Sequence, residues 1–139
     1  MISVFCKFYE NLNASSLAEL NTVYTQNVRF IDPVGEHNGL EALHSYFDNL
    51  LENCTTCHFT LHQTQLVEQH GFVTWTMAFS HPKLINGKTL CLEGCSEIRF
   101  SADQKVCFQR DYYDLGAMLY EHLPVLGPAI KWLKRRLNQ

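Results

Sequence analysis

The chain has 139 residues with 46% hydrophobic and 12% aromatic content, which is typical of one compact domain with a substantial core. Its net charge of -3, from 11 basic and 14 acidic side chains, argues against a general nucleic-acid-binding protein, which carries a basic surplus. No signal-like leader and no apolar run of about 18 residues is present. We therefore expect a cytoplasmic protein with a single domain over residues 1–139 and reduced cysteines.

Helical patterns come first in the chain. Residues 2–12 form one apolar face, with Val4, Phe5, Phe8 and Leu12 at helical spacing. Ser16 and Glu19 have the spacing of a capping box, which predicts the start of a second helix. The apolar positions of that helix are Leu17, Leu20, Val23 and Tyr24.

A short strand that ends at an acid follows the two helices. Val28, Phe30 and Ile31 favour an extended backbone, and Pro33 forces the residue before it out of the helical region. Asp32 therefore stands at the strand end. If this end lines a cavity, its apolar neighbours desolvate the carboxylate and make it a better proton acceptor, as a general base requires. A surface turn at Asp32 is the alternative.

The rest of the pattern predicts a helix and then a sheet. After a polar loop at residues 36–39, an apolar helix face contains Leu40, Leu43, Phe47, Leu50 and Leu51, and we expect this helix to pack behind the Asp32 strand. Alternating residues then predict strands at 58–68, 72–81, 88–100 and 105–114. Asn86-Gly87 predicts a hairpin turn. The expected fold class is α+β, with a cone-shaped, curved antiparallel sheet wrapped around the N-terminal helices.

The C-terminus predicts two short helices separated by Pro124. The first contains Leu115, Met118 and Leu119, and the second contains Leu126, Ile130, Leu133 and Leu137. Four basic residues surround the second apolar stripe: Lys131, Lys134, Arg135 and Arg136. This helix either closes the pocket or packs on the sheet with a solvated basic face, or it lies on an anionic membrane with Trp132 among the charges.

The element order and the motif Asp32-Pro33-Val34-Gly35 before an apolar helix resemble the nuclear transport factor two-like superfamily. This superfamily includes ketosteroid isomerases, SnoaL-like polyketide cyclases and limonene epoxide hydrolase, and the resemblance covers nearly the whole chain. It implies a cystatin-like or SnoaL-like α+β barrel. It places Asp32 on the isomerase Asp that shuttles a proton beside the steroid carbonyl. Phe8 and Ser96 then stand where the isomerase has its two oxyanion donors, a Tyr and a neutral Asp. A Phe cannot donate and a Ser is a weaker donor, and Tyr9 is expected to face about 100° away from Phe8 on a helix.

A second motif, residues 110–115, looks like the last-strand segment of limonene epoxide hydrolase. The resemblance places Asp111 on the Asp that activates the attacking water, and SnoaL-like cyclases also use an Asp in this strand as acid or base. The hydrolase completes its site with an Arg and a second Asp, where this chain has the apolar Met77 and Phe79. An epoxide hydrolase is therefore the less favoured kind of enzyme. The last strand is rich in Tyr, and its hydroxyls are expected to stabilise the charge of Asp111.

The cysteines leave two metal hypotheses, neither of which we favour. Cys54 and Cys57 directly before His58 have the spacing of haem attachment, but no export signal accompanies them. Cys91 and Cys95 could complete a zinc site, but on a strand they lie about 13 Å apart. We expect neither a metal nor a cofactor.

These observations predict a small-molecule pocket protein. We expect it to act as a cofactor-independent isomerase, cyclase or lyase of dehydratase type, which removes a proton next to a carbonyl with Asp32 or Asp111 as the general base. Expected pocket residues are Phe8, Tyr24, Phe47, Ser96 and Tyr113. A non-catalytic ligand-binding or partner-binding domain is the alternative. The expected ligand is apolar, such as a lipid, a steroid or a polyketide. We also expect a homodimer through the outer face of the sheet, because Trp75 and Phe79, together with Thr74 and Thr76, make both faces of their strand too apolar to be left in water.

Overall fold

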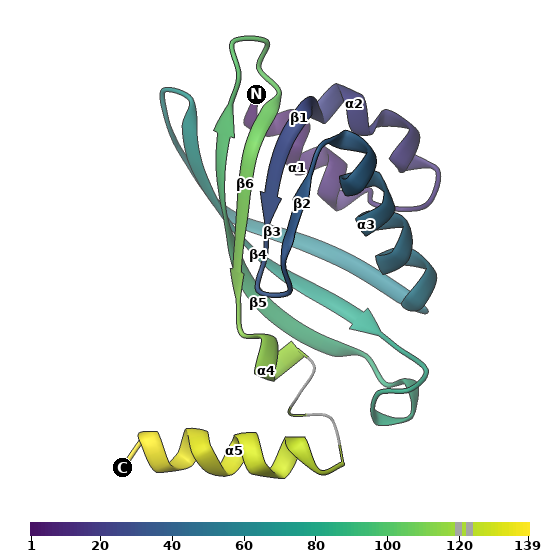
Figure 1. Ribbon diagram of the computed structural model, residues 1–139, viewed down its shortest axis with the longest axis vertical. Coiled ribbons are helices and arrows are strands. Elements are labelled where there is room, and N and C mark those ends of the chain that lie inside the picture. Colours follow the sequence, from purple (N-terminus) through teal and green to yellow (C-terminus); the bar gives the residue numbers. More distant parts are fainter. Residues whose placement is uncertain (119–120, 122–123) are drawn as a thin grey trace.

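The chain folds into a curved, six-stranded sheet with helices against its concave face, in a computed structural model that describes all residues except 119–120 and 122–123 (Figure 1). The strand order is β2-β1-β6-β5-β4-β3. Neighbouring strands are antiparallel except β1 and β6, which are parallel. The strands are β1 (Tyr24–Ile31), β2 (Glu36–Asn38), β3 (Thr56–Val67), β4 (His70–Ser80), β5 (Leu90–Phe100) and β6 (Val106–Tyr113). The α+β prediction is confirmed.

The N-terminal helices are α1 (Ile2–Glu10), the 3-10 helix η1 (Ser16–Glu19), α2 (Leu20–Val23) and α3 (Leu40–Asn53). The expected capping box is wrong, because Asn13 makes the turn instead: its Oδ1 accepts the backbone N–H groups of Ser15 and Ser16 at 2.9 and 3.0 Å. In α1, Val4 is exposed and Tyr9 is buried. Tyr24 opens β1 rather than ending a helix.

Two connections differ from their predictions. Residues 36–38, expected as a loop, form β2 because they pair with the end of β1, where Arg29 and Glu36 make an ion pair of 2.7 Å. Asn86-Gly87 lies within the 3-10 turn η2 (Ile85–Gly87) of a longer loop. Pro82 lacks a backbone donor, so β4 ends at Ser80 and the pairing with β5 resumes only at Leu90.

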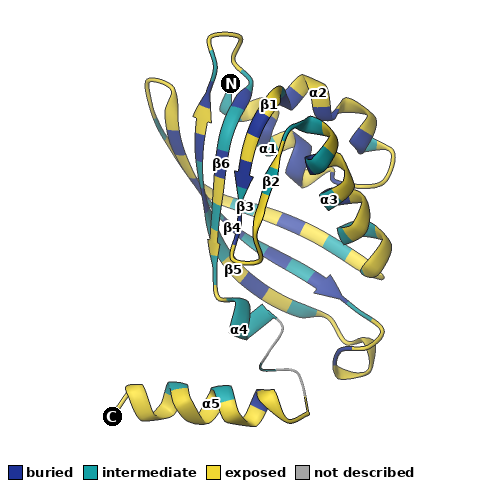
Figure 2. Ribbon diagram, viewed as in Figure 1, coloured by how far each residue is buried: buried dark blue, intermediate teal, exposed yellow. Residues whose placement is uncertain are grey.

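The core lies where α1, α2 and α3 meet the sheet (Figure 2). Alternation along β4 places one set of side chains inside: Val73, Trp75, Met77 and Phe79. The outer face of this strand carries Phe72, Thr74 and Thr76. Trp75 and Phe79, which supported the expected dimer, therefore both face inward. The homodimer remains a prediction that light scattering at micromolar concentration can check.

The C-terminal region leaves the sheet after β6. It comprises α4 (Leu115–Met118) and α5 (Leu126–Leu137), and the expected helical position Leu119 lies outside the described residues. Helix α5 stands apart from the sheet, so the expectation that it packs there is wrong (Figure 1). Lys134 of α5 forms ion pairs with Asp114 and, at 2.9 Å, with Glu121. None of the described helices is long and apolar enough to span a bilayer.

Candidate functional site

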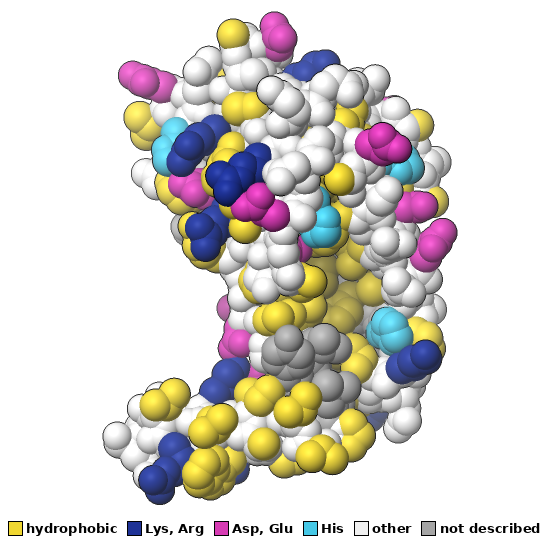
Figure 3. Space-filling view, in the orientation of Figure 1, with side chains coloured by type: hydrophobic (Ala, Val, Ile, Leu, Met, Phe, Trp, Pro, Cys, Tyr) yellow, Lys and Arg dark blue, Asp and Glu magenta, His cyan; other side chains and the backbone are white. Residues whose placement is uncertain are grey.

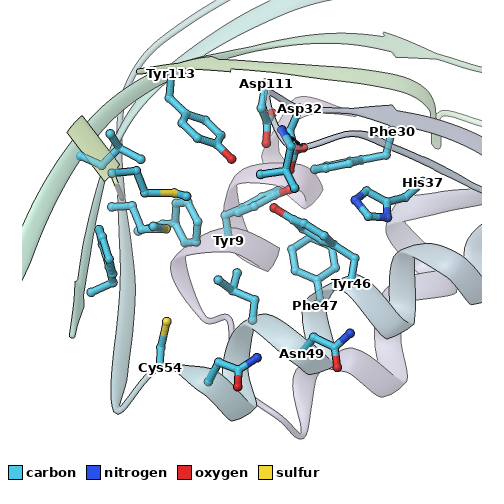
Figure 4. A pocket seen from close by; sticks show the side chains of 18 of the residues that line it. Tyr9, Phe30, Asp32, His37, Tyr46, Phe47, Asn49, Cys54, Asp111 and Tyr113 are labelled. Atoms are coloured by element: carbon cyan, nitrogen blue, oxygen red, sulfur yellow. Dashed lines mark hydrogen bonds between the residues drawn. The ribbon is translucent and has the colours of Figure 1, made fainter. Parts of the chain in front are cut away.

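A cavity of about 640 Å³ lies between α3 and the concave face of the sheet. Its walls are mainly apolar: Phe30, Phe47, Leu50, Phe59, Trp75, Met77, Phe79, Leu84 and Leu92. Polar side chains gather toward one end, where Figure 4 shows them pointing toward one another. These are Tyr9, Asp32, His37, Tyr46, Asp111 and Tyr113. The site is therefore an apolar chamber with a polar end that holds two carboxyl groups.

Asp32 lies at the polar end because β1 stops there. The backbone turns at Pro33, with the Asp32 N–H donating to the Gly35 carbonyl at 2.9 Å. The Asp32 Oδ1 accepts the N–H groups of Val34 and Gly35 at 2.9 and 3.0 Å. Its Oδ2 is buried without a partner among the described residues, and the side chain is 6% exposed. Asp32 therefore makes the turn and also lines the cavity, so both alternatives from the sequence describe it.

Asp111 faces the same cavity from β6. The strand register places it beside Ser96 of β5, whose hydroxyl donates to the Asp111 Oδ1 at 2.6 Å. Gln109 Nε2 donates to the same oxygen at 2.8 Å. Burial raises the pKa of Asp111 from 3.8 to about 6, the two hydrogen bonds oppose this rise, and the negative charge of Asp32 adds to it. Asp111 therefore changes its charge near neutral pH.

The hydrogen-bond donors to Asp111 differ from the expected ones. We expected tyrosine hydroxyls along β6 to stabilise the charge of Asp111, but Ser96 and Gln109 supply its hydrogen bonds. Tyr113 donates to no described residue, and burial raises the pKa of its hydroxyl. Ser96 is fixed in turn by Trp75, whose Nε1 donates to the serine oxygen at 2.9 Å.

A closed ring of hydrogen bonds lies behind Asp111. Tyr24 donates its only hydroxyl proton to Gln109 Oε1 at 2.7 Å, so Tyr9 must be the donor in its 3.0 Å bond to Tyr24. Gln109 Nε2 closes the ring by donating to the Tyr9 oxygen at 3.0 Å. The second proton of this amide goes to Asp111. The ring therefore fixes the orientation of the amide that holds the carboxyl group.

The structure brings four of the seven predicted site residues to the cavity: Asp32, Asp111, Phe47 and Tyr113. The other three lie behind its wall: Phe8, Tyr24 and Ser96. Phe8 packs edge-on against the rings of Tyr9, Tyr24 and Phe47, while Tyr24 and Ser96 belong to the hydrogen bonds described above.

Tyr9 was expected to face away from the site, and that expectation is wrong. Phe8 and Tyr9 are three and four residues after Phe5, and these are the two spacings that share one helix face. Both are buried, but Tyr9 is the one that lines the cavity.

The sequence analysis also missed Tyr46, His37 and Gln109. Tyr46 follows Leu43 by three residues, so helical spacing indicates that it faces the same side as Phe47. Its ring lies 4.6 Å from that of His37, whose Nε2 is buried without a partner among the described residues. Gln109 is two residues from Asp111, and strand alternation therefore places both on one face.

The side chains that line the cavity argue against the epoxide hydrolase alternative. Met77 and Phe79 line the cavity, so no charged pair occupies the positions that such an enzyme would need. Arg110 points away from Asp111 and stacks on the outer ring of Tyr112, 5.1 Å from its centroid. The described cavity lining thus contains two carboxyl groups and no Lys or Arg.

The Trp75 ring packs directly against Gly94, where a side chain would have no room. Gly94 lies opposite Trp75, and a Cβ at position 94 would overlap the indole ring at Cη2. The buried ring cannot move aside without losing its bond to Ser96. We expect Gly94→Ala to lower the free energy of unfolding by about 1–3 kcal/mol, measured by urea denaturation.

The matched control is Gly35→Ala, because a Cβ there would meet nothing within 4 Å. Tryptophan emission should move to longer wavelength in Gly94→Ala as Trp75 is displaced. Equal stability of the two variants would show that the indole ring has room to move.

The chain is similar to known proteins in both sequence and fold. The SnoaL-like domain model matches residues 6–108. No curated protein matches the sequence. A protein with a ketosteroid isomerase-like fold from Catenulispora acidiphila, in complex with trimethylamine, is similar with a TM-score of 0.72 and 13% identity, covering 85% of this chain and 88% of that chain.

Two further solved structures have the same fold. A proposed SnoaL-like polyketide cyclase from a Jannaschia species has a TM-score of 0.75 and 10% identity, covering 91% of this chain and 90% of its own. TerC, co-crystallized with polyporic acid, has a TM-score of 0.72 and 12% identity, covering 84% and 93%. Such identities bear on the fold alone, whereas the domain match covers most of the sequence. The chain belongs to the SnoaL-like domain family.

Proposed function

We propose that the protein binds an apolar carbonyl compound and transfers a proton at the carbon next to the carbonyl. The observation that carries this proposal is the pair of carboxyl groups, Asp32 and Asp111, at one end of an apolar cavity. Two acids in different surroundings can divide the roles of base and acid between them.

Asp32 is the proposed base. Its Oδ1 is held by two backbone N–H groups, so the partnerless Oδ2 is the atom that would take the proton. Asp111 is the proposed acid. Ser96 and Gln109 both occupy its Oδ1, which leaves Oδ2 to carry a proton toward the carbonyl oxygen. Its pKa of about 6 makes this proton available in weakly acidic solution.

Two tyrosine hydroxyls can supply the hydrogen bonds to a carbonyl oxygen that Phe8 and Ser96 do not supply. Tyr46 and Tyr113 line the cavity and have no hydrogen-bond partner within the described part of the chain. Burial raises the pKa of both, so both stay protonated and can donate to a carbonyl oxygen. They are the proposed oxyanion contacts.

The size and walls of the cavity support a ring-shaped, apolar substrate. A volume of about 640 Å³ lies within the range of sites for drug-sized molecules. Aromatic side chains from β1, α3 and β4 supply flat surfaces for stacking. TerC, which shares the fold, was co-crystallized with polyporic acid, and this supports testing quinones and polyketides first.

One observation favours a contrasting function as a non-catalytic ligand-binding domain. Asp32 Oδ2 is closed off by its surroundings, so a substrate reaches it only if the side chain or a neighbour moves. In this alternative the two carboxyl groups position a ligand without exchanging protons with it.

Hydrogen exchange separates the two functions. Steroids, quinones and polyketide-like ketones are first screened by thermal shift, and each compound that binds is incubated with the protein in D₂O. Loss of the α-proton signal in NMR, faster than in buffer alone, is the expected result. Tight binding of several ketones without any acceleration would instead establish the binding domain.

A further inference from the structure

Helix α5 exposes an apolar stripe. Leu126, Leu133 and Leu137 follow one another at helical spacing, and Leu137 is 87% exposed. Trp132 faces about 100° around the helix from Leu133, at the edge of the polar side, and is 52% exposed. In Figure 3 hydrophobic side chains gather along the arm that projects from the body, where α5 lies in Figure 1. The stripe thus exposes three leucines, while Ile130 between them is partly buried. Exposed apolar side chains that gather on one face mark an interaction site more often than scattered ones do.

Charge is distributed unevenly between this segment and the rest of the chain. Residues 125–139 contain four of the 11 basic side chains and none of the 14 acidic ones. Lys134 faces the body and pairs with Asp114 and Glu121, so it holds the helix in place. Lys131, Arg135 and Arg136 are exposed, and Arg136 stacks on the Trp132 ring at 5.4 Å. A positive, apolar helix therefore projects from a negatively charged body.

We propose that α5 docks the protein on an anionic phospholipid surface. An amphipathic helix with leucines on one side, an aromatic ring at the boundary and basic side chains around it has the composition of a helix that lies in a bilayer interface. The leucines enter the boundary of the acyl chains, and Lys131 and Arg135 remain near the phosphates. Three exposed cations complement a negative surface.

A second copy of the chain fits this helix less well. Pairing α5 with α5 would bring two sets of cations together, and like charges that face each other cost binding energy. Lysine is also depleted at the centres of protein interfaces, where aromatic and apolar groups are enriched. The charge pattern therefore favours lipid.

Docking through α5 has a consequence for the cavity. Helix α4, which joins β6 to this C-terminal region, supplies Met118 to the cavity lining. In Figure 3 the hollow lies directly above α5. A lipid-bound α5 brings the chamber close to the bilayer, from which an apolar ligand can enter. Only the entry of a ligand from the bilayer into the cavity rests on the proposed function, whereas the docking of α5 does not.

Vesicle flotation tests the docking itself. The whole protein is mixed with vesicles of phosphatidylcholine alone or with phosphatidylglycerol added, at low and at high salt. We expect flotation with the anionic vesicles and its loss at high salt. Lys131→Gln with Arg135→Gln should weaken binding about thirtyfold, since each basic residue near an anionic surface contributes about fivefold.

Two further variants complete the design. Lys7→Gln with Lys105→Gln removes the same charge from α1 and the β5–β6 turn, far from α5 in Figure 1, and should leave binding within about twofold. Leu133→Ser with Leu137→Ser should weaken binding at least about tenfold. Trp132 emission should shift to shorter wavelength on binding, and Trp132→Phe should lose this shift yet still float.

Three results would overturn the proposal. The first is wild-type protein that does not float with anionic vesicles. The second is equal binding by the α5 charge variant and the body charge variant. The third is a dimer in light scattering that the Leu133→Ser, Leu137→Ser variant abolishes, because a second copy would then be what covers the stripe.

Discussion

Replacing Asp32 with Asn is expected to slow α-proton exchange on a bound ketone by about 10²–10⁴-fold, the usual contribution of a positioned general base. The Asn side-chain oxygen can still accept the N–H groups of Val34 and Gly35, so the turn should remain intact. The amide nitrogen then replaces Oδ2 and cannot take up a proton. Ligand affinity in the thermal-shift assay should therefore change far less than the exchange rate.

Asp48→Asn is the matched control, because Asp48 is an exposed residue of α3 and does not line the cavity. It should keep the wild-type exchange rate. If Asp32→Asn also exchanges at the wild-type rate, Asp32 is only a turn residue and the base must be sought elsewhere.

Asp111→Asn is expected to stabilise the protein in neutral and alkaline solution. The carboxyl group has a pKa of 3.8 in its ordinary surroundings and about 6 in the fold. The fold therefore binds this proton more tightly than the unfolded chain does, and stability falls as pH rises from about 3.8 to about 6. The total loss is about 3 kcal/mol, and Asn avoids it.

The measurement is urea denaturation of the wild type and of Asp111→Asn at several pH values. Between about pH 5 and about pH 8 the free energy of unfolding of the variant should rise relative to that of the wild type by about 1–2 kcal/mol, roughly half of the total. Ketone exchange by the wild type should fall as pH rises through about 6, where Asp111 loses its proton. A stability difference that does not vary with pH would mean that Asp111 ionises normally.

Most of the fold was predictable because its signals are local. Apolar spacing in α3 and alternation in β3 to β6, clearest in β4, indicate which face is buried, and both were identified. The errors lie in short segments, such as β2 and η1, where pairing or a single Asn decides the conformation. Three residues of β2 carry too weak a pattern to distinguish them from a loop.

The candidate site was only partly predictable. Asp32 and Asp111 follow from motifs, and both reach the cavity. The partners of Asp111 do not follow, because they depend on the register between strands and on which face of α1 turns inward. Ser96 was identified as a weak donor to the ligand, yet its proton goes to Asp111. The partner of Ser96 depends on how the strands pack in three dimensions, and the spacing of residues along the sequence does not show this.

The parallel pairing of β1 with β6 determines when the site can form. The bond between Tyr24 and Gln109 joins residues 85 apart in sequence, and that between Tyr9 and Gln109 joins residues 100 apart. Closing such long loops is slow, because chain entropy is lost before these contacts are gained. During synthesis the N-terminal helices and β1 to β5 emerge first, and the facing edges of β1 and β5 stay unpaired until β6 arrives between them. The last strand to be made is thus the one that completes both the sheet and its chemistry.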